Sequence, residues 1–429
     1  MNKIYLIDVT NRDGVQTAKL GLAKLEKTMV NLYLNEMGVH QSEFGFPVTR
    51  HELHYLNANL ELVEMGVLKP IILSGWCRAI VDDIEASFRN VPKIKHLNIS
   101  ISTSVQMTVG KFGDRIVRSP KENPTKPNLI QMMTDALDRA KELGIETVGV
   151  NAEDASRTDD EFLIEFAHAA KSHGADRIRY CDTLGYDDPF TIYERIKLLA
   201  KETQIPIELH CHNDLGMAVG CSVAGAKGAI DGGVDAYINT CINGMGERAG
   251  NADLVSVILA LQKSSGFGTG AKYILDERVK LSCAWEIAKY ASIAFGVPIP
   301  INQTAVGANA FAHESGIHAD GALKDRRNYE LYDFEELGRG KLEVVETGRQ
   351  IVTGEYSGIK GFRNVAEKLE IKFKDQEEAT KILELVRYAN VHTQKPLLDC
   401  EVEFIAKYPD IAQKVMTVTP LAGGLVSGD

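Results

Sequence analysis

Residues 207–214 read IELHCHND, a short β-rich run that ends in histidine, asparagine and aspartate side chains. It is the seventh of eight such runs, and longer amphipathic stretches separate them through the first two-thirds of the chain. The alternation predicts strands at Ile4–Thr10, Gln41–Phe46, Ile71–Trp76, His96–Ser102, Thr147–Asn151, Arg177–Asp182, Ile207–His212 and Ala236–Ile242. Eight strand–helix alternations over about 270 residues predict an α/β fold, a (β/α)8 TIM barrel. An open doubly wound sheet is the structural alternative.

The stretches between the predicted strands have helical periodicity. Apolar residues recur at helical spacing from Leu25 to Met37, and Gly38 is placed to end that helix. A further helix is predicted over Asp276–Phe295. We therefore expect a TIM-barrel catalytic domain over residues 1–275 and small, mainly helical C-terminal accessory subdomains over residues 276–429. The last residues, LAGGLVSGD, are predicted to form a flexible tail.

The charge balance narrows the classes of partner. The chain has 48 basic and 59 acidic residues, and its formal net charge of −11 argues against nucleic acid, which binds clustered Lys and Arg. No run of eighteen or more apolar residues is present, so no membrane helix is predicted. The N-terminus MNKIYLIDVTNRDG lacks the features of a signal peptide. Seven scattered cysteines favour reduced thiols, and we expect a cytoplasmic protein.

Polar residues that follow the predicted strands are the candidates for chemistry, because strand ends converge at one face of a barrel. His210 and His212 are two apart on a strand, so both side chains point to the same face while Cys211 points away. Asp13 follows the first strand, and together the three side chains suit Mn²⁺, Mg²⁺, Co²⁺, Fe²⁺ or Zn²⁺. The alternative is a coincidental pattern in which one histidine is merely packed.

Seven segments carry a resemblance to a known family: DVTNRDGVQT, EFGFP, NAEDASRTD, CDTLGY, HCHNDLGMAVG, NGMGERAGN and HESGIHADG. They resemble segments of the metal-dependent TIM-barrel acyltransferases that include 2-isopropylmalate, homocitrate, citramalate and Re-citrate synthases. The likeness runs from the first strand to about residue 360 and is greatest to the Re-citrate synthase group. The barrel more distantly resembles that of HMG-CoA lyase.

The resemblance implies a metal site and a charge-stabilising arginine. The implied ligands of the divalent cation are Asp13, His210, His212 and, as a fourth, Asn251. Arg12 resembles the arginine that stabilises negative charge on an enolate or alkoxide. The alternatives are a turn role for Asn251 and a salt bridge on the barrel rim for Arg12.

The resemblance also implies a base and contacts to the acceptor. Glu153 and His318 match a Glu/His pair that removes a methyl proton from acetyl-CoA. Thr183 would bind the carboxylate of the 2-oxo acid, although it is nearly as well explained as a turn residue, and Gln16 contacts the same acid. In related enzymes the histidine-bearing segment covers the neighbouring subunit's site, so the accessory subdomains are expected to serve dimerisation, as a homodimer, and to cover the active site.

The implied activity is a Claisen-type condensation of acetyl-CoA with a 2-oxo acid, with release of CoA. The preferred acceptor is oxaloacetate, giving citrate; the alternatives are 2-oxoglutarate, as in homocitrate synthase, and then the acceptors of 2-isopropylmalate and citramalate synthases. A dicarboxylic acceptor needs a cation for its distal carboxylate, and Arg78, past the third strand, is the first candidate, before Arg50 and His51. Two other classes are a metal-dependent lyase and a non-catalytic regulator that binds metal or CoA.

Overall fold

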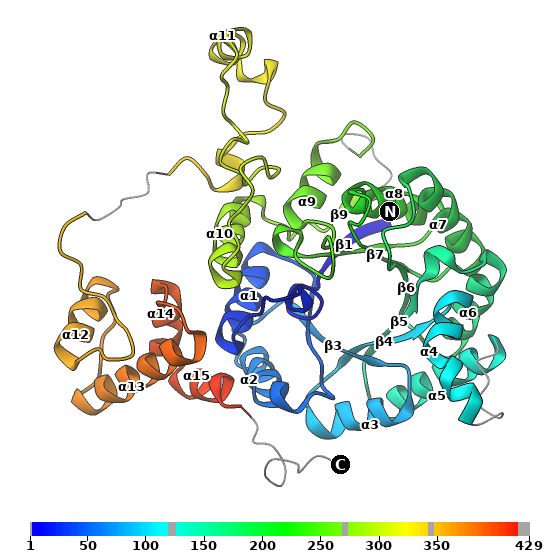
Figure 1. Ribbon diagram of the computed structural model, residues 1–429, viewed down its shortest axis with the longest axis horizontal. Coiled ribbons are helices and arrows are strands. Elements are labelled where there is room, and N and C mark those ends of the chain that lie inside the picture. The colour runs from blue at the N-terminus through cyan, green and yellow to red at the C-terminus, as the bar shows by residue number, and fades with distance from the viewer. Residues whose placement is uncertain (1, 119–125, 268–272, 342–346, 419–429) are drawn as a thin grey trace. The chain divides into compact units, whose positions relative to one another are not determined.

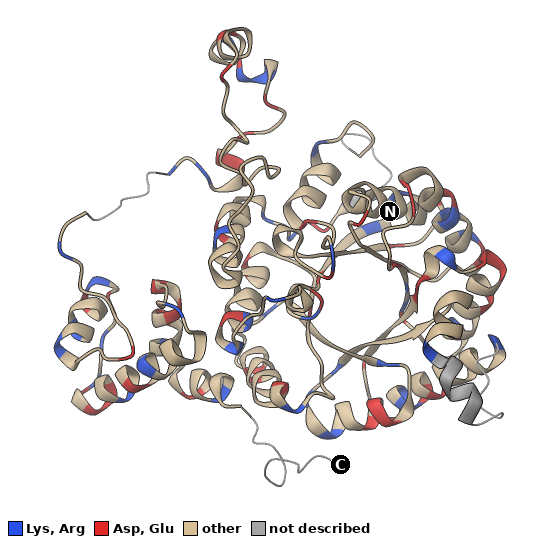
Figure 2. Ribbon diagram, in the orientation of Figure 1, with Lys and Arg blue, Asp and Glu red and all other residues tan. Residues whose placement is uncertain are grey.

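A computed structural model describes residues 2–118, 126–267, 273–341 and 347–418 of the protein, without the side chains of 112–118, 273 and 274. The predicted tail LAGGLVSGD lies outside the described residues. Within the described part, basic and acidic residues are interspersed along the helices (Figure 2). None of the helices described there combines the length and the apolar character needed to cross a bilayer.

In the part of the chain that the structure describes, nine parallel strands build the central sheet (Figure 1). They are β1 (Asn2–Asp8), β2 (Gln41–Gly45), β3 (Ile72–Arg78), β4 (His96–Ser102), β5 (Thr147–Glu153), β6 (Arg177–Asp182), β7 (Ile207–Cys211), β8 (Ala236–Thr240) and β9 (Tyr273–Leu275). Strands β2 to β8 pair in chain order, and β1 pairs with both β8 and β2. This closes the eight-stranded barrel, confirms the predicted (β/α)8 fold and excludes the open sheet.

All eight predicted strands are present, and two of them, β4 and β6, have the predicted bounds. Strand β1 ends two residues earlier than predicted, because the chain turns directly after it. The amides of Arg12, Asp13 and Gly14 all donate to the carbonyl of Val9. Arg12 and Asp13 follow β1 in sequence, but the turn keeps both residues close to the end of the strand. The ninth strand, which pairs with the start of β1, was not predicted.

The helices alternate with the strands and then continue alone. They are α1 (Lys24–Met37), α2 (Leu53–Glu64), α3 (Val81–Asn90), α4 (Val105–Arg118), α5 (Lys126–Glu142), α6 (Asp160–Ser172), α7 (Pro189–Thr203), α8 (Ala218–Asp231), α9 (Leu254–Lys263), α10 (Ala284–Phe295), α11 (Gly316–Lys324), α12 (Ile359–Lys368), α13 (Gln376–Thr393), α14 (Asp399–Lys407) and α15 (Pro409–Met416). Figure 1 shows α3 to α9 around the strands.

Two helix predictions have different outcomes. Gly38 ends α1 as predicted, with a φ of 80°, and a Cβ there would lie 1.9 Å from the carbonyl oxygen of Arg278, so only glycine fits. The predicted helix over Asp276–Phe295 is wrong in its first two turns, since α10 begins at Ala284. The backbone before Ala284 forms hydrogen bonds outside any helix. The amide of Asp276 donates to the carbonyl of Ile4, and the amide of Lys280 donates to the carbonyl of Met37.

The chain forms two compact units. The first comprises Met1–Gly21, Tyr33–Val48 and Pro70–Gly340; the second comprises Leu22–Leu32, Thr49–Lys69 and Lys341–Asp429. In the second unit α15 packs against α2, and Lys414 forms an ion pair with Glu61 at 2.5 Å. These units interleave along the chain, whereas the sequence predicts one boundary at residue 275. That division into 1–275 and 276–429 stays a prediction.

Candidate active site and metal centre

The ends of β1 and β7 bring together three side chains of the kinds that ligate metal ions. The Nε2 atoms of His210 and His212 each lie 4.0 Å from Oδ2 of Asp13. All three residues are buried, and one ligand atom from each lies within 4.8 Å of the others. This is the one group of three or more His, Cys, Asp or Glu side chains with metal-binding spacing among the described residues.

The donor atoms of this cluster are in the right state for a cation. Burial lowers the pKa of His210, and the neighbouring His212 lowers it further. Burial also lowers the pKa of His212, so both rings are neutral and keep a lone pair for a ligand bond. Burial by itself raises the pKa of Asp13, but the charge of Arg12 and the hydrogen bond from Asn251 act against it, and the pKa is held well below the ordinary value. The carboxylate is therefore ionised.

An orphaned polar atom beside the cluster also fits a bound cation. Oδ1 of Asn251 is buried with no hydrogen-bond partner among the described residues. Asn251 reaches the cluster through an isolated bridge to His212, and its Nδ2 donates to Oδ2 of Asp13 at 2.5 Å. Buried polar atoms are normally paired. The cluster thus has unmet coordination capacity that a divalent cation and its water would satisfy.

Arg12 joins the cluster to a second buried carboxylate. Its Nη1 donates to Oδ1 of Asp13 at 2.9 Å, and its Nε donates to Oε2 of Glu43 at 2.5 Å. Burial opposes ionisation of Glu43, but Arg12 and Arg179 lower its pKa to about 2. The guanidinium is held between two carboxylates and points at the metal-ligating side chains. It is a fixed cation rather than a mobile one on the rim.

The interior of the barrel continues this pairing as a ladder of buried charges. Arg179 donates to Glu43 at 2.8 Å and to Glu208 at 2.6 Å, and Arg177 donates to Glu208 at 2.5 Å. These residues come from β2, β6 and β7. Branched aliphatic side chains usually fill the centre of a TIM barrel. Here an ion-pair ladder, made of Arg12, Glu43, Arg179, Glu208 and Arg177, fills part of it and fixes the floor of the site.

A pocket of about 390 Å³ opens above this ladder at the carboxyl ends of the strands. Seven of the ten predicted site residues line it: Arg12, Asp13, Gln16, Glu153, Thr183, His210 and His212. Oγ1 of Thr183 accepts a hydrogen bond from the amide of Asp154 at 2.9 Å, which leaves its hydroxyl proton available as a donor. An eighth predicted site residue, Asn251, does not line the pocket but donates to Asp13.

Glu153 lies at the end of β5 with a cationic partner. Its two carboxylate oxygens each lie 2.6 Å from Nζ of Lys111, which comes from α4. Oε2 also accepts a hydrogen bond from Ser102 at 2.5 Å. The carboxylate is therefore held in one orientation, and it faces the same pocket as Asp13, His210 and His212. This is the placement that a base acting on a bound substrate requires.

Two predicted residues are not brought to this pocket. Arg78 forms a two-point ion pair with Asp83 and is 61% exposed, and it does not line the pocket. His318 lies on α11, where it is exposed and stacks on Tyr329 with ring centres 4.3 Å apart. It does not line the pocket of its own chain either. The neighbouring His313 lies 3.1 Å from Glu330, which suits a local structural role.

Sequence reasoning assigned no role to three residues that shape the site: Glu43, which it noted within the second strand, Lys111 and Arg179. The signal for Arg179 was present, because Arg177 and Arg179 alternate along a strand that is buried throughout. A charged residue at every second position of a buried barrel strand indicates a polar interior. No sequence pattern indicates Lys111. It lies on α4, and only the packing of that helix brings it to Glu153 at the end of β5.

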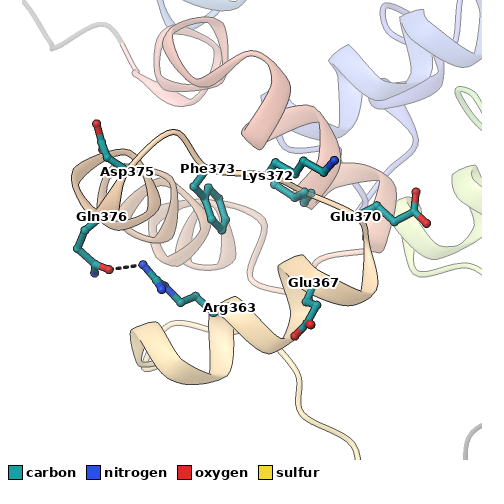
Figure 3. Close-up of a pocket in the computed structure, with 8 residues that line it drawn as sticks. Arg363, Glu367, Glu370, Lys372, Phe373, Asp375 and Gln376 are labelled. Carbon is teal, nitrogen blue, oxygen red and sulfur yellow. Dashed lines mark hydrogen bonds between the residues drawn. The ribbon is translucent and has the colours of Figure 1, made fainter.

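A second cavity, of about 980 Å³, lies in the second unit (Figure 3). Charged side chains of α12 and of the segment between α12 and α13 line it, and Arg363 donates to the side chain of Gln376 across it. It contains none of the predicted site residues. The barrel pocket is therefore the candidate active site.

Known proteins identify the family. Residues 3–290 match the HMGL-like family, and residues 305–393 match the homocitrate synthase post-HMGL domain-like family. The chain belongs to the HMGL-like family. This HMGL-like protein is 61% identical over 422 residues to the citrate (Re)-synthase of Dehalococcoides mccartyi strain CBDB1, covering 98% of this chain and 99% of that one. The resemblance predicted from the seven segments is confirmed.

Other relatives agree with this placement. The chain is 39% identical over 417 residues to 2-isopropylmalate synthase 2 of Caldanaerobacter subterraneus subsp. tengcongensis, covering 96% of each chain. Its fold resembles that of the hydroxymethylglutaryl-CoA lyase from Pseudomonas aeruginosa, with a TM-score of 0.54, 15% identity, and coverage of 70% of this chain and 95% of that one. The likeness to the lyase concerns the barrel fold alone.

Proposed function

We propose that this HMGL-like protein is an acyltransferase that condenses acetyl-CoA with oxaloacetate and water, giving citrate and CoA. One observation carries the proposal. The metal-ligating cluster, a fixed arginine and an oriented carboxylate share one pocket, in a chain 61% identical to a citrate (Re)-synthase over nearly its whole length. An acyltransferase of this kind converts the acetyl group into an alkyl substituent of the product. Homocitrate synthesis from 2-oxoglutarate is the second candidate, favoured by the match of residues 305–393.

Asp13, His210 and His212 would hold the divalent cation, with Asn251 directing the Asp13 carboxylate or joining the ligands. Nitrogen and carboxylate donors suit Mn²⁺, Mg²⁺ or Co²⁺, and Zn²⁺ accepts the same set. When bound, such a cation polarises the ketone of a 2-oxo acid and binds its adjacent carboxylate. Thr183 supports this orientation, because its free hydroxyl proton can donate to that carboxylate.

Glu153 and Arg12 act in the condensation step, after which water hydrolyses the thioester of the product and CoA leaves. Glu153 removes a methyl proton from acetyl-CoA, alone or through His318, and the resulting carbanion attacks the ketone carbon. Arg12 stabilises the negative charge that develops on oxygen, because the two carboxylates that hold its guanidinium already fix its direction. Fixed donors of this kind contribute on the order of 3 kcal/mol to transition-state stabilisation. Gln16 lines the pocket beside them.

We further propose a cytoplasmic homodimer in which His318 of one copy acts in the pocket of the other. Two observations support this arrangement: His318 is exposed and outside its own pocket, and α11 contains no buried residue. Mixing the inactive variants Glu153→Gln and His318→Ala should then restore up to about a quarter of wild-type activity, because mixed dimers regain one complete site. No recovery after subunit exchange would contradict action across the interface.

A substrate panel tests the reaction itself. Protein stripped with a chelator and reloaded with Mn²⁺ is incubated with acetyl-CoA and either oxaloacetate, 2-oxoglutarate, pyruvate or 2-oxoisovalerate. Release of CoA is followed with a thiol reagent, and products are identified by mass spectrometry. We expect citrate from oxaloacetate at the highest kcat/KM. Condensation with 2-oxoglutarate alone would establish the second candidate, and cleavage of HMG-CoA without any condensation would replace both with a lyase.

A further inference from the structure

Four cations line the barrel pocket, and three of them are committed to the protein. Arg12 and Arg179 belong to the buried charge ladder. Arg248 donates to Asp214 at 2.9 Å and to the carbonyl of Thr183, so it braces the loops that follow β6 and β7. Lys111 differs because its side chain is 47% exposed and comes from α4 rather than from the barrel wall. Among the described residues it is the lining cation best able to meet a solute.

The contacts of Lys111 leave one of its donors replaceable. Two N–H groups point at the oxygens of Glu153, each at 2.6 Å, and a longer contact of 3.1 Å reaches Oγ of Ser102. Ser102 does not depend on that contact, since its own hydroxyl donates to Glu153. An ammonium has three donors. The third can therefore donate to an incoming acceptor that takes the place of Ser102, while the other two keep the Glu153 pair.

A dicarboxylic acceptor makes such a donor necessary. If the 2-oxo acid binds the metal cluster through its ketone and adjacent carboxylate, the second carboxylate must lie elsewhere in the same pocket. Glu153 already places a negative charge there. Two carboxylates sharing one site repel each other unless a cation lies between them. A monocarboxylic acceptor such as pyruvate creates no such conflict.

We propose that Lys111 binds the distal carboxylate of the acceptor, screens it from Glu153 and thereby selects a dicarboxylic 2-oxo acid. This inference rests on the proposed condensation and assigns to Lys111 the part that the sequence assigned to Arg78. Lys111 would be a specificity-determining residue, and it would also position the base. The two roles have different kinetic consequences. Loss of screening should raise the KM for dicarboxylic acceptors alone, whereas loss of positioning should lower kcat with every acceptor.

The variant Lys111→Met tests the proposal, because it keeps the length of the stem and removes the charge. We expect the KM for oxaloacetate to rise roughly 10- to 100-fold, the loss of one hydrogen bond to a charged group. The KM for acetyl-CoA should stay within about twofold, and turnover of pyruvate relative to oxaloacetate should increase. Lys111→Arg should restore most of the affinity for oxaloacetate. Lys141→Met, which breaks an ion pair with Asp176 away from the pocket, is the matched control.

A measurement on the wild-type protein covers the case in which the variant folds poorly. Lysine acylation followed by peptide mass spectrometry should show Lys111 protected by oxaloacetate, with the metal bound, and not by pyruvate. Equal loss of kcat for every acceptor, with the KM for oxaloacetate unchanged, would reduce Lys111 to a support for Glu153 and overturn the proposal. So would a selective rise in KM from Arg78→Met instead. Absence of oxaloacetate condensation by the wild-type protein would instead refute the proposed function.

Discussion

Replacing Glu43 with glutamine should lower both the stability of the barrel and its turnover number, kcat. Glu43 accepts hydrogen bonds from Arg12, Arg179 and Asn98, at 2.5, 2.8 and 2.8 Å, and is completely buried. Glutamine has nearly the same shape but no charge. An NH2 group takes the place of one carboxylate oxygen, and because it can only donate, it faces an arginine donor with no acceptor to offer. The substitution therefore tests the charge of Glu43 rather than its volume.

The structure allows the magnitude to be worked out. The buried cations Arg12, Arg177 and Arg179 are balanced by the buried carboxylates Asp13, Glu43 and Glu208. Removing one carboxylate leaves the barrel interior with an unpaired positive charge, which typically costs 3–5 kcal/mol. The pKa of Glu43 gives a similar figure, because a fall from 4.5 to about 2 corresponds to about 3 kcal/mol. We expect Glu43→Gln to lower the free energy of unfolding by roughly 3 kcal/mol.

The assay is urea unfolding followed by circular dichroism at pH 7 and at lower pH. Because the folded pKa of Glu43 lies below 4.5, its contribution is complete above that pH and is lost as the pH falls toward 2. The difference between wild type and Glu43→Gln should therefore shrink in acid. Glu146→Gln, which breaks an exposed pair with Lys95, should cost less than about 1 kcal/mol and serves as the control. Equal stability of wild type and Glu43→Gln at pH 7, with unchanged kcat, would refute the ladder argument.

Three further outcomes follow from the site. His212→Ala should abolish metal binding in a calorimetric titration and reduce turnover by at least about a thousandfold, and a variant that binds metal normally would remove His212 from the ligand set. Glu153→Gln should bind metal like the wild type yet lose the exchange of acetyl-CoA methyl protons with deuterated solvent; undiminished exchange would show that another group is the base. Exhaustive chelation should stop CoA release, and Mn²⁺ should restore it, whereas full activity without metal would end the metal proposal.

The barrel and its metal-ligating cluster could be predicted because both depend on local periodicity. Alternation of short apolar runs with helical stretches gave all eight strands, and the two-residue spacing of His210 and His212 placed both on one face. Parallel-barrel geometry then brought Asp13 to them across nearly two hundred residues of sequence. Nothing more than strand order was needed for that step.

The rest depended on contacts that spacing does not encode. Arg78 lies at the end of a strand, like the residues that line the pocket, but a carboxylate on the next helix holds it away from the pocket. Lys111 reaches the pocket because α4 packs close to the end of β5, and the spacing of residues within α4 does not indicate that contact. The false start of the helix at Asp276 has the same origin, since backbone bonds to β1 and α1 override helical propensity there.

The ladder of buried charges also limits how the barrel can be recombined with its relatives. Its rungs come from β2, β6 and β7 and from the turn after β1, so no half of the barrel contains a complete set. A chimera that exchanges one of these strands imports a charge without its counterion, even where the donor barrel has an identical backbone. Hybrid proteins of this family should therefore inherit those four segments from a single parent, so the segment from β3 to β5 can be exchanged only through a pair of crossovers, one before it and one after it.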